Sequence, residues 1–171
     1  MADARFIAEN VLRALHIDEA DDGHIGHLAD ICRRDDTLYS WRNATIAEYN
    51  GVPAGLMVSY DGAGYRRMRD VTFPMIRIYV GDDYSSMDDE ACAGEYYLDS
   101  LSVLPGYRRK GIASALIRQM LRQRDESGIP LATIAVDPDN DNAYRLYLKN
   151  GFRHDGRITV FNTTYDRLIQ P

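Results

Sequence analysis

The chain has few cysteines, since its 171 residues include only Cys32 and Cys92, far apart and without metal-binding spacing. This scarcity argues against a disulfide-stabilised secreted fold and favours a reduced, cytoplasmic protein. No apolar run approaches the roughly 20 residues that a membrane helix requires. The first residues also lack the basic start and apolar core of a signal peptide. We therefore expect neither a membrane association nor export.

Positive charge is also in deficit, with 20 Lys and Arg against 26 Asp and Glu, giving a net charge of -6. An acidic protein binds nucleic acid poorly, because affinity depends on cationic side chains that neutralise phosphates. We expect no nucleic-acid partner, whereas a cationic small substrate stays open. The length predicts a single domain over residues 1–171 with a sizeable core. The sequence leaves a homodimer open.

The first third of the chain predicts two helices and a hairpin. Apolar residues at helical spacing indicate a helix over residues 3–15, capped by Asp3, and a second over residues 25–33. The apolar positions of the first helix are Ile7, Val11 and Leu15. Strands follow over residues 44–49 and 56–60, and Asn50-Gly51 between them is a strong hairpin signal.

The last half of the chain predicts a parallel crossover unit. A strand over residues 95–104, a helix over 111–127 and an apolar strand over 131–136 follow one another. A short helix then ends at Asn150. Two closing strands are predicted over residues 152–157 and 158–165.

Residues 62–94 form the least predictable segment, which carries arginines, then apolar residues, then acids. A connection of this length is usually a functional lid or an ordered insertion. The acids are Asp82, Asp83, Asp88, Asp89 and Glu90. Two interpretations of this acidic run stay open: a solvated, partly mobile connection, or a flap that selects a positively charged group.

The turn that leads into the helix at residue 111 has the composition of a pyrophosphate-binding loop. Gly111 lets a ligand approach the backbone, and a helix start offers unpaired N–H groups and the positive end of the dipole. Arg108, Arg109 and Lys110 add positive charge beside it.

Two motifs in this order are similar to the signatures of the GCN5-related N-acetyltransferase superfamily. The first is Val103-Leu104-Pro105 followed by Arg108-Arg109-Lys110-Gly111-Ile112-Ala113. The second is Asn140, Ala143, Leu146-Tyr147 and Gly151-Phe152. The resemblance covers residues 44–152. It departs in one place, because the family usually opens with a short strand and this chain is predicted to begin in a helix.

The resemblance implies an α/β fold, in which helices flank a central twisted mixed sheet whose parallel strands splay apart. It implies acetyl transfer from acetyl-coenzyme A to a primary amine of a small molecule or peptide, without a metal. The coenzyme-binding residues would be Leu101, Ser102, Val103, Arg108, Arg109, Lys110, Gly111, Ile112, Ala113, Ser114, Asn140 and Tyr147.

The proton transfers have three candidate residues. Tyr147 matches the family tyrosine near the coenzyme sulfur and would protonate the departing thiolate; the alternative interpretation is a core aromatic on the inward face of its helix. Aligned to the histone-type members, the basic glutamate falls at Tyr97. Asp99 and Glu95 lie one step to either side on the same strand face, so each is a candidate base. Water is the third candidate for the base. A structural role for Asp99, in an ion pair with an arginine or as a cap of a backbone group, is equally compatible with the sequence.

Two other functions compete with the enzyme. One is a regulatory module that binds the coenzyme but has lost acetyl transfer. The presence of both Tyr147 and Asn140 favours the enzyme over this module. The weaker one is a thioester hydrolase or a Cys92-dependent transferase, which lacks a histidine near that cysteine in sequence.

Overall fold

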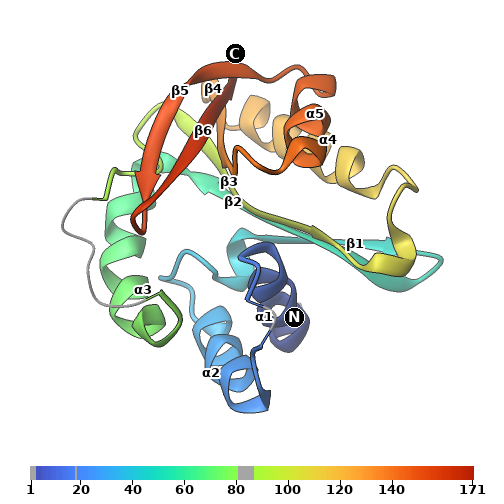
Figure 1. The fold of residues 1–171 in the computed structure, drawn as a ribbon, viewed down its shortest axis with the longest axis vertical. Coiled ribbons are helices and arrows are strands. Elements are labelled where there is room, and N and C mark those ends of the chain that lie inside the picture. The colour runs from blue at the N-terminus through green and yellow to red at the C-terminus, as the bar shows by residue number, and fades with distance from the viewer. Residues whose placement is uncertain (1–2, 18, 81–86) are drawn as a thin grey trace.

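The computed structural model describes residues 3–17, 19–80 and 87–171, built around a six-stranded mixed sheet in the order β1-β2-β3-β4-β6-β5 (Figure 1). The strands are β1 (Ala44–Tyr49), β2 (Val52–Asp61), β3 (Glu95–Val103), β4 (Leu131–Val136), β5 (Arg153–Val160) and β6 (Thr163–Gln170). β3 and β4 pair in parallel and the other neighbours are antiparallel, which confirms the expected mixed sheet.

Helices cover both faces of this sheet. They are α1 (Ala4–Ala14), α2 (Asp22–Arg33), α3 (Tyr65–Val80), α4 (Ile112–Glu126) and α5 (Asp141–Lys149). Figure 1 shows α1, α2 and α3 on one side of the sheet and α4 and α5 on the other. Each side has its own apolar core, and β2 is buried along most of its length because both faces are covered.

The two N-terminal helices follow the sequence prediction with small corrections. Asp3 caps α1 by accepting the N–H groups of Arg5 and Phe6 at 3.0 and 3.4 Å. Leu15 does not share the buried face, because it follows the last turn and is 38% exposed. α2 begins three residues earlier than expected, at Asp22, because Asp21 is its N-cap and accepts the N–H of His24. No strand precedes α1 within the part of the chain that is described.

Residues 62–80, the first part of the segment over residues 62–94, are ordered and mostly helical. This part contains α3, which the sequence did not predict. Its buried residues recur at helical spacing: Tyr65, Met68, Thr72 and Ile76. Arginines between them and Pro74 within the helix conceal this pattern in the sequence. Asp82 and Asp83 of the predicted acidic run lie outside the described residues.

The closing hairpin turns at a different place from the prediction. β5 continues through residue 158, and the turn is formed by Phe161 and Asn162, with φ of 46° and 60°. Asparagine tolerates this left-handed conformation, but phenylalanine rarely adopts it. Phe161 therefore gave no turn signal, and the predicted break between residues 157 and 158 was wrong.

The parallel strands separate partway along their length. β3 and β4 pair from Glu95–Leu131 to Leu98–Ile134 and no further. Beyond this point β3 continues to Val103 against β2, while β4 stays paired with β6. The sheet is thus open between β3 and β4 from residue 99 onward, as the family resemblance predicted.

Candidate active site

The start of α4 presents unpaired backbone N–H groups. The first helical hydrogen bond runs from the N–H of Ala115 to the carbonyl of Gly111 at 2.9 Å. The preceding N–H groups, on Ile112, Ala113 and Ser114, have no intrahelical acceptor. Gly111 adopts a φ of 80° and has no side chain to cap them, and a Cβ there would meet nothing within 4 Å. These groups can therefore bind an anion.

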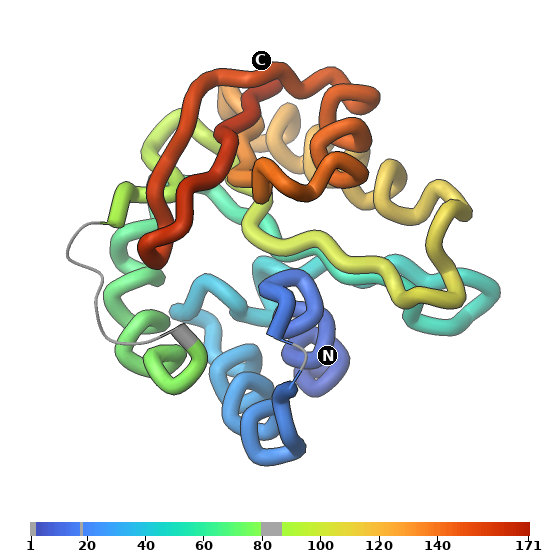
Figure 2. Tube along the Cα trace, viewed as in Figure 1, coloured from blue at the N-terminus to red at the C-terminus, as the bar shows by residue number. Residues whose placement is uncertain are grey.

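Three exposed cationic residues, Arg108, Arg109 and Lys110, precede this helix start. Arg108 Nε donates to the carbonyl of Val103 at 3.2 Å, and Lys110 Nζ lies 4.7 Å from the ring centroid of Tyr49. Figure 2 shows this loop, in yellow, beside the β1–β2 hairpin that carries Tyr49. The loop is thus held against the sheet with its charges in solvent.

The free edge of β3 begins where the strands separate. Leu101 and Val103 pack toward α4, whereas Ser102 is buried on the other face and donates to Asn10 Oδ1 at 2.7 Å. Since the side chain of Ser102 already has a partner within the core, only its backbone remains for a ligand. The edge offers backbone N–H and carbonyl groups on its β4 side.

Asp99 is the first residue beyond the β3–β4 pairing and lies at a β-bulge. Ser100 pairs with Val58 and Leu98 with Ser59, so Asp99 is the extra residue between them. Its carboxylate accepts hydrogen bonds from Tyr60 Oη at 2.7 Å and Ser100 Oγ at 2.8 Å. Burial raises the pKa of Asp99. The bulge thus positions a half-buried carboxyl at the opening.

Glu95 lies at the other end of β3, within the paired region. Arg167 Nη2 is 2.5 Å from its carboxylate, and Thr133 Oγ1 donates to it at 3.4 Å. The structure therefore does not bring Glu95 to the opening, and its charge is already compensated by a cation.

Cys92 donates its Sγ–H to Glu95 Oε1 at 3.3 Å. Partial desolvation and the Glu95 carboxylate raise the pKa of the Cys92 thiol. A nucleophilic cysteine needs the opposite shift, because the thiolate is the reactive form. The contacts of Cys92 thus give no support to a cysteine-dependent reaction.

Tyr147 approaches the sheet from the α4 and α5 side. Its ring lies edge-on to Phe152 at 5.8 Å between centroids, and burial raises its pKa. The phenol therefore keeps its proton at neutral pH. Asn140 accepts the N–H of Ala143 at 3.1 Å and caps α5, which accounts for this residue structurally.

Glu90, which the sequence identified only as part of the acidic run, is a further candidate base. Its carboxylate accepts hydrogen bonds from Tyr97 Oη at 2.8 Å and Tyr65 Oη at 3.2 Å. Burial, with a further contribution from Asp99, raises the pKa of Glu90 to about 7. No local pattern distinguishes Glu90 from its acidic neighbours; only the folding of α3 against β3 does.

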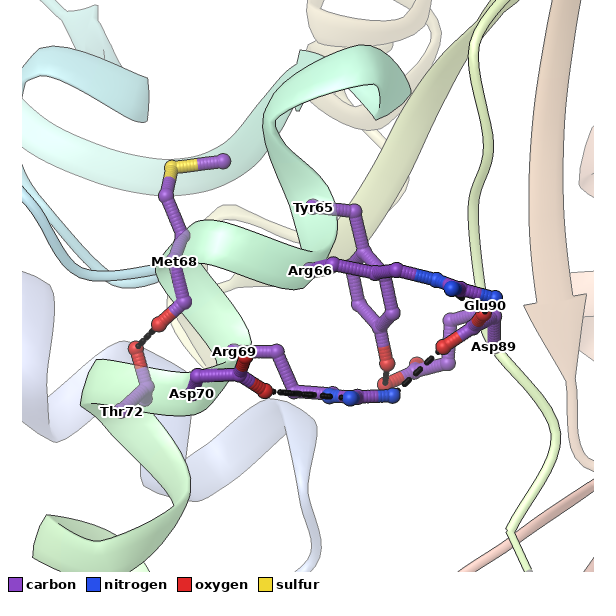
Figure 3. Close-up of polar contacts among 8 residues, drawn as sticks. All are labelled: Tyr65, Arg66, Met68, Arg69, Asp70, Thr72, Asp89 and Glu90. Atoms are coloured by element: carbon purple, nitrogen blue, oxygen red, sulfur yellow. Dashed lines mark hydrogen bonds and ion pairs between the residues drawn. The ribbon is translucent and has the colours of Figure 1, made fainter.

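The two acids before Glu90, Asp88 and Asp89, already have partners within the protein. Asp89 pairs with both Arg66 and Arg69 (Figure 3), and each of the two ion pairs measures 2.5 Å. Asp88 makes two hydrogen bonds with the backbone of Thr159: its carboxylate accepts the Thr159 N–H at 2.7 Å, and its own backbone N–H donates to the Thr159 carbonyl at 2.9 Å. These two acids therefore hold the segment in place, and they give no support to a flap that selects a cation.

The described residues contain no group of three or more His, Cys, Asp or Glu arranged to hold a metal ion. No helix among them is both long and apolar enough to cross a membrane.

Comparisons with known proteins agree with the fold and the motifs. A GCN5-like protein acetyltransferase of Mycobacterium tuberculosis is 35% identical over 57 residues, which are 33% of this chain and 28% of that relative. The match thus spans well under two thirds of the relative's length. An N-acetyltransferase structure from Staphylococcus aureus superposes with a TM-score of 0.78 at 23% identity, covering 98% of this chain and 94% of that chain.

A second solved structure, the PaiA N-acetyltransferase of Thermoplasma acidophilum in complex with coenzyme A, has a TM-score of 0.59. It is 14% identical and covers 98% of this chain and 92% of that chain. The family model for the acetyltransferase (GNAT) family matches residues 11–152, most of the chain. The protein is therefore a member of the GNAT acetyltransferase family.

Proposed function

We propose that this protein transfers an acetyl group from acetyl-coenzyme A to a primary amine. The observation that carries the proposal is the opening between β3 and β4, which adjoins the basic N-terminus of α4. A pyrophosphate fits the unpaired N–H groups at the helix start and the three cations before it. A pantetheine arm fits the free backbone edge at residues 101–103.

The coenzyme would supply an activated acetyl thioester, and residues of this chain would remove the proton of the amine and protonate the leaving thiolate. Asp99 takes a proton from the acceptor ammonium, because the amine must be neutral to attack. Tyr147 donates its phenolic proton to the departing thiolate. Asp99 is bonded by Tyr60 from the α1–α3 core and Tyr147 belongs to the α4–α5 core, so the two approach from opposite faces.

We assign the base to Asp99 rather than Glu95. Glu95 is compensated by Arg167, whereas the described partners of Asp99 are neutral hydroxyl groups. A carboxyl without a cationic partner can attract an acceptor that arrives as an ammonium ion and take its proton. We also propose a cytoplasmic location, supported by the two free cysteines, Cys32 and Cys92.

The test is a panel of amines, including polyamines, aminoglycosides and peptides with free N-termini or lysines. We expect acetyl-coenzyme A to release free thiol with at least one member, and mass spectrometry to show an acetylated product. If calorimetry detects coenzyme binding but no amine releases thiol, the chain is a binding module and the proposal fails. No observation in the structure favours that module over the enzyme.

A further inference from the structure

We propose that Glu90 and Asp99 act as one proton-sharing carboxyl pair that accepts the proton of the acceptor ammonium. This inference rests on the proposed acetyl transfer and adds a residue to it. The two carboxyls come from different segments, Glu90 from the connection after α3 and Asp99 from the bulge of β3.

Two tyrosines bring the carboxyls to one patch. Tyr60 and Tyr97 are direct neighbours across β2 and β3, and their ring centroids are 5.8 Å apart. Tyr60 donates to Asp99 and Tyr97 donates to Glu90, at 2.7 and 2.8 Å. Glu90 and Asp99 are both half-buried, so the two acids combine a restricted environment with access to solvent.

The surroundings of the pair supply hydrogen bonds without positive charge. In the described chain, the recorded partners of the two carboxylates are the hydroxyls of Tyr60, Ser100, Tyr65 and Tyr97. Two like charges close together in a partly desolvated site do not ionise independently. The second ionisation is thus delayed toward neutral pH.

The other titratable groups that face the pair do not compete with it. They are the phenols of Tyr39 before β1, Tyr60 on β2, Tyr65 on α3, Tyr97 on β3 and Tyr165 on β6. Burial raises the pKa of every one of these phenols, so they stay protonated. The nearby cation, Arg69, lies over the ring of Tyr65 and pairs with Asp89.

Glu90 is fixed in place from both sides. Figure 3 shows Arg66 and Arg69 reaching from α3 to Asp89, with Glu90 beside it against Tyr65. On the other side the backbone passes so close to Gly62 that a Cβ there would lie 2.3 Å from the carbonyl oxygen of Cys92. A glutamate held this firmly keeps a constant relation to Asp99.

The proton transfers of the pair and of Tyr147 act on different atoms of the reactants. The acceptor ammonium loses one proton to the doubly ionised pair, and the neutral nitrogen forms a bond to the acetyl carbon while the carbon–sulfur bond breaks. The nitrogen then releases its second proton to solvent, and solvent returns one proton to Tyr147 after it has protonated the thiolate, so the net reaction releases a single proton. The leaving thiolate takes its proton from Tyr147. The pair later returns its extra proton to solvent.

The experiment combines a structural readout with a kinetic one. Side-chain carboxyl ¹³C signals of the full chain are titrated by NMR, and kcat/KM is measured from pH 5 to 9 with an amine found in the panel. The variants are Glu90→Gln, Glu90→Asp and Asp99→Asn. The matched control is Glu126→Gln, at the exposed end of α4. Calorimetry with coenzyme A and thermal unfolding report whether each variant is folded.

We expect the Glu90 carboxyl to titrate at about pH 7, and its midpoint to fall by about one unit in Asp99→Asn. The kcat/KM profile should rise through the same midpoint. Glu90→Gln should move that rise to lower pH and reduce the plateau about tenfold, because a weaker base remains. Glu90→Asp should keep a rise in the neutral range, and Glu126→Gln should match the unsubstituted protein.

Three results would contradict the proposal that Glu90 and Asp99 share a proton. In the first, Glu90 titrates below pH 5 whether or not Asp99 is present. In the second, Glu90 titrates at neutral pH but the Glu90→Gln rate profile superimposes on that of the unsubstituted protein. Either leaves acetyl transfer intact. In the third, the unsubstituted protein transfers to no amine, and then the proposed function fails together with the role of the pair.

Discussion

Among single residues, Tyr147 allows the most direct test of the proposed proton donor. Tyr147→Phe removes one oxygen and keeps the contact with Phe152. We expect kcat to fall by about 10²-fold, because general acid catalysis is lost, while the Kd for acetyl-coenzyme A stays within about twofold. Steady-state kinetics and calorimetry give the two values. Tyr144→Phe, on the same helix, is the control and should leave both unchanged; an unchanged kcat in Tyr147→Phe would remove the acid role.

Gly111 tests the anion site at the same scale. Gly111→Asp places a carboxylate beside the N–H groups proposed to bind pyrophosphate, so calorimetry should show at least about 100-fold weaker binding of coenzyme A. Gly111→Ala is the control, because it brings the same backbone strain at φ 80° without the charge. Equal affinities for the two variants would show that strain, not charge, governs the loss, and would remove the anion-site assignment.

Local and nonlocal residues differed in how well the sequence predicted them. The features at Gly111 and Asn140 are local, since a glycine before a helix and an asparagine cap depend on a few adjacent positions. Asp99 became a candidate base because it lies one step from Tyr97 on the same face of the strand. Glu90 depends on Tyr65 and Tyr97, which lie 25 and 7 residues away, and its own neighbours are acids of a different role.

At the scale of elements, the attachment of α3 to residues 87–90 is the link that positions Glu90. Arg69 and Asp89 are 29% and 23% exposed, so their ion pair is better shielded than a surface pair. A double-mutant cycle of Arg69→Ala and Asp89→Ala should give a coupling free energy of about 1 kcal/mol in urea unfolding. Asp89→Ala should also lower kcat, because Glu90 loses its support.

The exposed pair Arg145–Asp141 on α5 is the matched control, with side chains 77% and 78% exposed. Its cycle should give less than about 0.5 kcal/mol. If the two cycles give the same coupling, the attachment of α3 contributes no more than a solvated ion pair. If Asp89→Ala leaves kcat unchanged, Glu90 is positioned by its tyrosines alone.

The elements that the sequence predicted well are those whose signals are local. The unit from β3 to β4 was predicted because Gly111 and Gly128 bracket an apolar helix between two apolar strands. α3 was missed because Pro74 and the arginines interrupt a stripe that forms only when the helix packs on the core. The last hairpin was misplaced because its turn includes Phe161, whose type gives no turn signal.

For the whole molecule, the carboxyl pair links activity to stability. A carboxyl whose folded pKa lies above its unfolded value binds its proton more tightly in the folded state. Folding therefore gains stability from that proton at low pH, and this gain is lost as the pH rises from the unfolded pKa to the folded one. For Glu90 the interval runs from 4.5 to about 7. Asp21 and Asp36 have lowered pKa values and act in the opposite direction, so the total profile mixes both.

The difference between the unsubstituted protein and Glu90→Gln isolates this contribution. Glutamine stays neutral at every pH, so the variant should be more stable above pH 7 and similar below pH 4.5. One unit of pKa shift corresponds to about 1.4 kcal/mol, and solvent screening of a half-buried carboxyl reduces the total, so we expect a gain of about 2 kcal/mol at pH 8. Urea unfolding at pH 4.5, 6 and 8 measures it. A variant that is more stable yet slower would mean that the protein keeps a destabilising carboxyl for catalysis. A variant equally stable at pH 8 would show that the folded protein tolerates both charges, and the pair would then have no reason to hold a proton.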